Sequence, residues 1–327
     1  MDALAGLLDG PRARGAFLLR MVMEPPWSVR VEDRAPLALM CMTEGTAWIV
    51  PDSAEPVPLR AGDLAIVRGP APYTIADSPE TEPQAVAGPG GTCHSLRGQP
   101  LMRSMLMGVR SWGNDPDGSD VMQIGTYQMS GEVGGRLLGA LPPLIHLPAD
   151  ALECPLLPIL DEELRRDEPG QSVMLDRMLD LVLVSALRSW LARPEARAPG
   201  WYRAMGDPVV GAALRLMQRE PAHPWTVAAL AARCGVSRAQ FARRFHELVG
   251  VPPMTHLTGL RLDLAADLLR SSDATIEAVA RKVGYSGSFA LSAAFKRVRG
   301  ISPREHRGGN GGPPDPPRLP EQQQISP

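Results

Sequence analysis

The sequence predicts a two-domain α+β protein, with an N-terminal β-barrel that carries a helical hairpin and a C-terminal all-α domain. Three observations predict this fold class. Short apolar runs broken by turn residues fill residues 17–128, the apolar period becomes helical from about residue 132, and one motif occurs twice after residue 225. With 327 residues, of which 44% are apolar, the chain is long enough to bury two cores.

The first domain, which we place at residues 1–130, reads as a series of short strands. Gly, Pro, Asp and Ser separate the runs, and this spacing is typical of an all-β sandwich or barrel. We expect residues 81–91, which include EPQAVAGPGG, to form a flexible loop. The predicted strands are FLLRMVM, LALMCMTEGTAWIV, DLAIVRG, PYTIA, LMRSMLMGV and MQIGTYQM.

Residues 131–199 are expected to be helical and to end in a linker. One helical stripe is widened by Leu181, Leu183 and Val184, so the helix needs more than one partner. That partner is either the chain's own barrel and neighbouring helix or a second copy in a homodimer. The stripe itself consists of Leu175, Met178, Leu179, Val182 and Ala186.

The Pro-rich stretch ARPEARAPG, residues 192–200, is the predicted domain boundary. The second domain then covers residues 200–307. Residues 308–327 contain too few apolar side chains to fold, and we expect a disordered tail.

The net charge of −2 conceals an uneven distribution. Residues 1–200 carry a net charge of −9 and residues 201–307 carry +8, so a polyanionic partner is expected for the second part. The N-terminus contains Asp2 and Asp9 and lacks the basic start of a secretory signal. Since no run of about 18 apolar residues occurs either, we expect a cytoplasmic protein without a membrane span.

The repeated motif pairs TVAALAARCGVS, residues 226–237, with TIEAVARKVGYS, residues 275–286. In each copy a Thr N-cap opens a short helix that stops at a Gly, and a second helix follows and ends at Gly250 or Gly300. Two helices joined by a tight turn that contains Gly describe a helix-turn-helix motif. The sequence therefore predicts two such motifs, joined by a helix of about 16 residues, roughly 24 Å long.

In the first copy, Phe241 and Phe245 are expected to face the core. The opposite face would then present Ala239, Ala242 and Arg243 to base edges, because a guanidinium matches the O6 and N7 acceptors of guanine. We expect phosphate contacts from Ser237, Arg238 and Arg244.

In the second copy, the expected core side chains are Leu291, Phe295 and Val298. Ser288, Phe289, Ser292 and Ala293 would face the groove, with apolar contacts to thymine methyl groups from Phe289 and Ala293. Phosphate contacts are expected from Ser286, Lys296 and Arg297. This face has few strong base readers, so the first copy is expected to dominate specificity.

WTVAALAARCGVSRAQFARRFHELVGVPPMTHLTGLRLDLAADLL and IEAVARKVGYSGSFALSAAFKRVRGISPREHR together resemble the DNA-binding domain of AraC/XylS-type transcriptional regulators. The A-x-x-x-G-[VY]-S turns, the R-x-F ending of the first recognition helix and the G-x-S-P-x-x-x-R close carry the resemblance, over about 100 residues. Ala293 departs from it, standing where the family often has Arg. LRAGDLAIVRGPAPYTI is similar to the cupin-type sensor domain of such regulators, so the resemblance implies a cupin-like barrel, promoter DNA as partner and control by a signal at the N-terminal domain.

Two classes of enzyme are the alternatives to a regulator. A metal-dependent cupin enzyme fused to a DNA-binding domain needs clustered histidines, but the first half has only His94 and His146 and no H-x-H pair. A DNA-alkylation repair protein needs clustered zinc-binding cysteines, and these are dispersed at Cys41, Cys93, Cys154 and Cys234. We therefore expect a regulator with no catalytic residue, metal or cofactor.

The nature of the signal stays open between a small molecule and an oxidant. Cys93 stands beside His94, which would favour the thiolate, and Cys41 is its candidate disulfide partner. RNA polymerase and a second copy of the chain are further candidate partners. By strand alternation, the candidate pocket residues for an unknown small-molecule effector are Met40, Met42, Trp48, Tyr73 and Met105.

Overall fold

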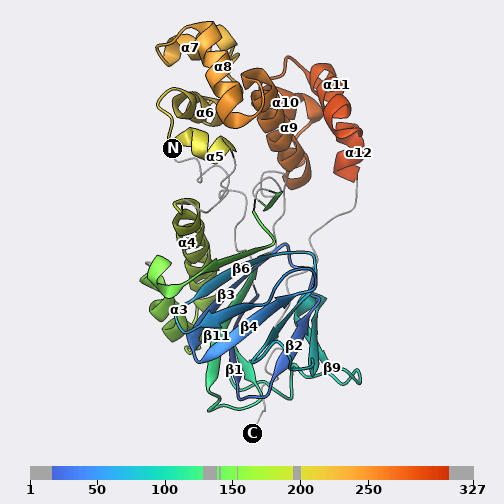
Figure 1. The fold of residues 1–327 in the computed structure, drawn as a ribbon. Helices are drawn as coiled ribbons and strands as arrows, with labels where there is room; N and C mark the ends of the chain where they lie inside the picture. The colour runs from blue at the N-terminus through green and yellow to red at the C-terminus, as the bar shows by residue number, and fades with distance from the viewer. Residues whose placement is uncertain (1–16, 128–137, 140, 153, 194–199, 309–327) are drawn as a thin grey trace. The chain divides into compact units, whose positions relative to one another are not determined.

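The computed structural model describes residues 17–127, 138–139, 141–152, 154–193 and 200–308. Two compact units divide them (Figure 1). The strand unit contains strands β1 to β12 with helices α3 and α4, and the helical unit contains helices α5 to α12. Each unit has its own core and is described separately.

The strand unit is built from two six-stranded sheets. Neighbouring strands run antiparallel except for β1 with β10 and β2 with β8, which are parallel. The first sheet has the order β10 (Ser111–Gly113), β1 (Phe17–Met23), β11 (Asp120–Tyr127), β3 (Leu37–Glu44), β6 (Leu64–Arg68) and β12 (Leu144–Leu147). The second has the order β5 (Val57–Arg60), β4 (Thr46–Pro51), β7 (Tyr73–Ala76), β2 (Ser28–Val31), β8 (Ala85–Gly88) and β9 (Thr92–Ser95).

The first sheet is buried on both faces. Met40 and Met42 of β3 point into the core between the sheets, so Cys41 between them points to the other face. Helices α3 (Leu156–Leu164) and α4 (Gln171–Leu191) pack on this unit. The α4 helix lies close to β11: the hydroxyl of Tyr127, at the end of β11, donates a hydrogen bond to the Leu179 carbonyl of α4 at 2.6 Å.

The apolar stripe predicted for residues 175–186 is the buried face of α4. Leu183 is buried as well, whereas Leu181 is 52% exposed. The chain's own sheet therefore covers the stripe, and the homodimer contact stays a prediction.

Three expectations for the strand unit differ from the structure. The strand pairings between described residues give two sheets and do not close a single barrel. LMRSMLMGV forms mostly turns, with one isolated bridge between Leu106 and Trp112 instead of a strand. The Leu101, Met102 and Met105 side chains pack on the core. The segment expected to be a flexible loop contains β8, which pairs with β2 and β9.

The helical unit has two small cores along one long helix, α9 (Pro253–Ser271). Phe241, Phe245 and Leu257 lie in the first core, and Leu291 and Phe295 lie in the second. The other helices are α5 (Gly200–Met205), α6 (Val210–Arg219), α7 (Val227–Arg233), α8 (Arg238–Val249), α10 (Ile276–Lys282), α11 (Ser288–Arg299) and α12 (Pro303–Gly308).

The helix boundaries of both pairs, α7 with α8 and α10 with α11, follow from local chemistry. Thr226 and Thr275 each accept a hydrogen bond at 3.1 Å from the backbone N–H three residues later, as N-cap side chains do. Gly250 and Gly300 end α8 and α11 at φ 87° and 77°, in the left-handed region that side chains other than glycine rarely adopt. The predicted caps are confirmed.

Candidate nucleic-acid interface and ligand cavity

The outer face of α8 presents the predicted base readers. Phe241 and Phe245 are fully buried, which turns Arg238, Ala239 and Arg243 outward, with Ala242 partly buried. The Arg243 side chain is 75% exposed, and its Nε lies 3.9 Å from Glu247 Oε1. An exposed pair of this kind contributes little stability, so the guanidinium can leave it for another acceptor at small cost.

Arg244, a predicted phosphate contact, forms an ion pair within the helical unit. Its Nε and Nη2 donate to Asp207 Oδ2 at 2.9 and 2.6 Å. The other Asp207 oxygen, Oδ1, accepts the N–H groups of Val209 and Val210 at the start of α6. Arg244 therefore ties α8 to the N-terminus of α6, and this pairing directs the guanidinium into the unit's own fold.

The outer face of α11 is nearly uncharged at its start. Phe289 is 88% exposed and Ala293 is also exposed, whereas Ser288 and Ser292 are partly buried. Lys296 and Arg297 are exposed in the last turn, as expected for phosphate contacts. Val298 is 56% exposed, so its predicted core position is wrong: Leu291, Ala294 and Phe295 already define the buried face of the helix.

The N-termini of the two outer helices differ in charge. The Ser237 hydroxyl caps α8 by accepting the Gln240 N–H at 3.3 Å. At α11 the Glu277 carboxylate accepts the Ser288 N–H at 2.7 Å, and this bond lowers the pKa of Glu277. A carboxylate there repels phosphate, so exposed Ser286 lies beside a less favourable anion site than Ser237 does.

Arg261 of α9 connects the two halves of the helical unit. Its Nε donates to the Pro221 carbonyl and its Nη2 to the His223 carbonyl, both at 2.7 Å. At the end of α10, a Cβ on Gly284 would lie 2.7 Å from the backbone of Ala222, so only glycine permits this approach. These contacts, together with the continuous α9 helix, hold the two pairs in one orientation.

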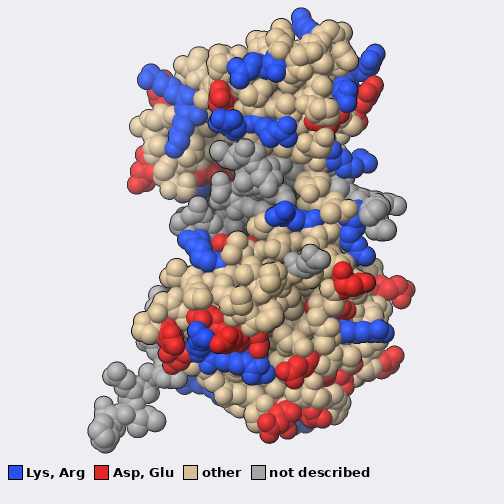
Figure 2. Space-filling view, turned by 90° about the vertical axis from the view of Figure 1, so that its left-hand side faces the viewer, with Lys and Arg blue, Asp and Glu red and all other residues tan. Residues whose placement is uncertain are grey.

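The surface charges follow the division of the chain into an acidic first part and a basic second part. On the face shown in Figure 2, Lys and Arg side chains are spread over the helical unit, and Asp and Glu gather on the strand unit.

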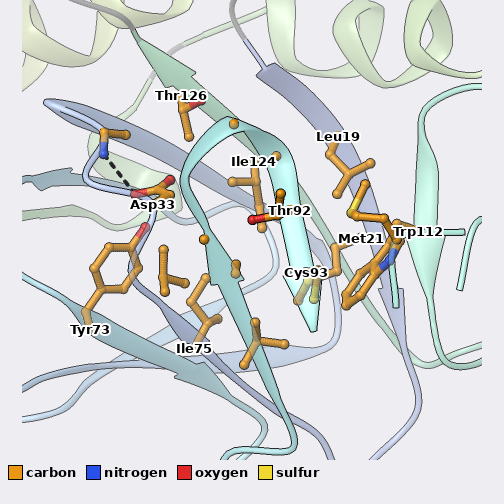
Figure 3. A pocket seen from close by; sticks show the side chains of 18 residues that line it. Leu19, Met21, Asp33, Tyr73, Ile75, Thr92, Cys93, Trp112, Ile124 and Thr126 are labelled. Atoms are coloured by element: carbon orange, nitrogen blue, oxygen red, sulfur yellow. Dashed lines mark hydrogen bonds between the residues drawn. The ribbon is translucent and has the colours of Figure 1, made fainter. Parts of the chain in front are cut away.

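A cavity of about 90 Å³ lies between the two sheets of the strand unit (Figure 3). Its walls are mostly apolar, and Asp33, Tyr73, Thr92 and Thr126 add polar groups. The volume is enough for several water molecules or a small organic molecule. Its apolar and aromatic lining includes Leu19, Met21, Val29, Val31, Ile75, Cys93, Met102, Trp112 and Ile124.

Of the five predicted pocket residues, only Tyr73 lines this cavity. Met40 and Met42 are fully buried in the core, and Met105 packs against that core. Trp48 lies between the buried Ala47 and Ile49 on β4, so alternation turns its side chain to the outer face of the sheet. The predicted effector residues therefore stay a prediction, and the cavity brings together a different set of side chains.

The cysteines are poorly placed for the predicted redox pair. Cys93 points into the core between the sheets, whereas Cys41 lies on the opposite face of the first sheet. Burial raises the pKa of Cys93 to about 11 and that of Cys41 to about 12, the opposite of an activated thiol. His94 does not face the Cys93 thiol, because neighbouring side chains on a strand point to opposite sides.

The histidines of the strand unit do not suggest a metal centre. His146 Nε2 lies 3.0 Å from Asp63 Oδ2, and Asp63 also accepts the N–H groups of Arg60 and Ala149, which is a structural role. Within the described ranges, no three His, Cys, Asp or Glu side chains are grouped as a metal ion requires. No helix in those ranges is long and apolar enough to cross a bilayer.

Comparisons with known proteins cover both parts of the chain. Residues 2–192 match the family model described as Cupin, and residues 230–309 match the one described as Helix-turn-helix domain. An AraC-like transcription regulator of Streptomyces lividans is 32% identical over 94% of this chain and 98% of its own length. A second, from Streptomyces antibioticus, is 31% identical over the same shares. The crystal structure of the DNA-binding domain of AdpA with a target DNA is 33% identical over 32% of this chain and 92% of that chain, with a TM-score of 0.30.

Proposed function

Because the chain belongs to the AraC-like transcription regulators with an N-terminal cupin domain, we propose that its two helix pairs are helix-turn-helix motifs that read one promoter site. Membership makes the protein a DNA-binding transcriptional regulator controlled by a signal at its N-terminal domain. Its action on promoter DNA would place it in the cytoplasm. The single observation that carries the proposal of base reading is the outer face of α8, where Arg243 is 75% exposed on a helix whose opposite face is fully buried.

In this proposal α8 lies in a major groove and Arg243 donates two hydrogen bonds to a guanine. Ala239 and Ala242 are small enough to let the helix approach the bases, and Arg238 with Ser237 binds the flanking phosphates. Arg244 is left out of this set because Asp207 engages it.

The α11 helix lies in the next major groove on the same face of the DNA. The 19 residues of α9 span roughly 28 Å at the standard helical rise, which is close to the ~34 Å of one DNA turn. Phe289 makes apolar contact with a thymine methyl group beside Ser288 and Ser292, while Lys296 and Arg297 bind phosphates.

The cavity of the strand unit is the proposed effector site. It is concave, mostly apolar and carries a few polar groups, as small-molecule sites do. A homodimer is supported by the exposed Val173, Met174 and Leu181 on α4. RNA polymerase stays an expected partner, and we assign no catalytic step to any residue.

The test is selection of bound sequences from random duplex DNA by the full chain at about 150 mM salt, followed by titration of the selected site at several salt concentrations. The proposal predicts one enriched motif with two parts about one helical turn apart, and an affinity that falls steeply with salt. Enrichment of a single short motif would contradict the reading by two helix pairs. Binding without any enrichment would contradict base readout altogether.

A further inference from the structure

The cavity between the sheets contains an unusual combination of groups for an effector site. Asp33 brings a carboxylate to a space with mostly apolar walls, and Figure 3 shows it on the same side as Tyr73, with Trp112 and Met21 on the other side. The Asp33 carboxylate is half-buried in the loop between β2 and β3. Its Oδ1 accepts the Ala35 N–H at 2.9 Å.

Asp33 has no counter-charge in the described part of the chain. Burial raises its pKa, the N–H groups of Ala35 and of Asp33 itself lower it, and no Arg, Lys or His contributes. Burial therefore disfavours the charged form of this carboxylate as long as no cation reaches it. An ionised carboxylate facing an apolar space is costly until a cation or a hydrogen-bond donor reaches it.

Tyr73 supplies a second unused polar group. The residue is 5% exposed, and no hydrogen-bond partner of its hydroxyl is found in the described ranges. Because Tyr73 lines the cavity, its hydroxyl is available to donate a hydrogen bond to a ligand or accept one from it. Burial and the Asp33 charge both raise the pKa of Tyr73, so its phenol stays protonated and can donate or accept.

From the Asp33 carboxylate, the unpaired Tyr73 hydroxyl and the aromatic far wall, we propose that the cavity binds a small organic amine as its effector. The ammonium group pairs with Asp33 and Tyr73, and an apolar or aromatic body extends towards Trp112 and Met21. The proposal rests on the proposed effector role of the cavity and adds the ligand's chemical class. A carboxylate ligand is disfavoured, because its charge would repel Asp33.

The test measures the affinity of the full chain for three probes that share a phenyl body. By calorimetry at neutral pH, 2-phenylethylamine should bind about tenfold or more tightly than 2-phenylethanol, since a charge-assisted hydrogen bond is about twice as strong as a neutral one, and 3-phenylpropanoate should bind weakest. Asp33→Asn keeps an oxygen for the Ala35 N–H, so the fold is retained. It should remove most of the preference for the amine.

One control outside the cavity and one further variant inside it locate the binding site. Asp117→Asn removes the same charge from an exposed position outside the cavity lining and should leave the amine affinity unchanged. Tyr73→Phe should weaken the amine and the alcohol together. Amine binding no tighter than alcohol binding, absence of amine binding, or an unchanged affinity in Asp33→Asn would each overturn the proposal.

The DNA selection described above is run on the same preparation without the probes. A chain that enriches a two-part motif but shows no preference for the amine keeps its proposed function and loses only this ligand class. A chain that prefers the amine but enriches no motif loses the proposed base reading and keeps the ligand class.

Discussion

The two helix pairs share a buried frame but carry different outer faces. Phe245 and Phe295 hold equivalent buried positions, and both pairs begin with a Thr cap and end at a left-handed Gly. Outside, an exposed Arg243 in α8 stands where α11 has Ala293. The frame is set by folding, which both copies need, whereas the outer face is free to differ because no packing depends on it.

The pairs also differ at their helix N-termini. The α8 helix starts at a neutral Ser cap, whereas the Glu277 carboxylate covers the start of α11. A phosphate would be attracted to the first and repelled by the second. On this ground we propose that the first pair does most of the base reading and N-terminal phosphate binding, and that the second adds contacts from Phe289 and the C-terminal cations.

The largest expected effect tests the shared frame. Phe245→Ala and Phe295→Ala each leave a cavity in a small core, and each should lower the free energy of unfolding by about 3–5 kcal/mol. Urea unfolding followed by far-UV circular dichroism measures this. Phe289→Ala is the matched control, because its exposed ring should change stability by about 0.5 kcal/mol or less. A clearly smaller loss in one core would break the equivalence of the frames.

The next effect concerns base reading. Arg243→Ala should cost about 1–3 kcal/mol on the selected DNA site and relax the preference at one base position. Fluorescence anisotropy with the selected site and its single-base variants measures both. Arg188→Ala removes the same charge from an exposed position on the strand unit and should leave affinity unchanged. Equal weakening on all sequences would show a phosphate contact instead.

A smaller effect is expected from the second pair. Phe289→Ala removes apolar contact with a thymine methyl group and should cost about 1 kcal/mol, on the scale of one or two buried CH₂ groups. The loss should disappear when uracil replaces that thymine. Val298→Ala, at an exposed position on another side of α11, should bind like the unaltered chain. A loss that persists with uracil would contradict the methyl contact.

The smallest effect separates a structural arginine from a DNA-binding one. Arg244→Ala should lower stability by about 1 kcal/mol or less, because the ion pair is part-exposed, and should leave the salt dependence of DNA binding unchanged. A flatter salt slope would return Arg244 to the phosphate contacts.

The same ion pair has a pH dependence. Burial alone would raise the pKa of Asp207, but the Val210 N–H and Arg244 outweigh it and hold the pKa below its ordinary value. A depressed carboxylate pKa stabilises the fold above its unfolded value, about 3.9, and that contribution is lost as pH falls through the folded pKa. Asp207→Asn should therefore flatten the acid limb of the stability curve.

The sequence predicted what depends on local pattern. The caps, the glycine ends and the buried Phe241, Phe245 and Leu291 follow from spacing within one helix or turn. Trp48 could have been placed correctly from its strand alone, since Ala47 and Ile49 set the phase of β4. For Trp48, the alternation of apolar residues along the strand was therefore a signal already present in the sequence.

The features that the sequence did not predict depend on contacts between distant segments. Asp207 lies 37 residues from Arg244 in the sequence, so no local pattern shows that the two pair. The separation of Cys41 from Cys93 follows from which face of the first sheet each side chain meets. Part of the cavity wall is formed by β8 and β9. These strands pair in a stretch whose Gly and Pro content indicates a loop.

The central claim is that the first pair reads bases more strongly than the second, and a double-mutant cycle between protein and DNA tests it most directly. Affinities of the unaltered chain, Arg243→Ala and Phe289→Ala are measured on the selected site and on each of its single-base variants. The account predicts a coupling of about 1–3 kcal/mol between Arg243 and one guanine, and a smaller one between Phe289 and a thymine one turn away. A larger coupling at Phe289, or none at Arg243, would contradict it.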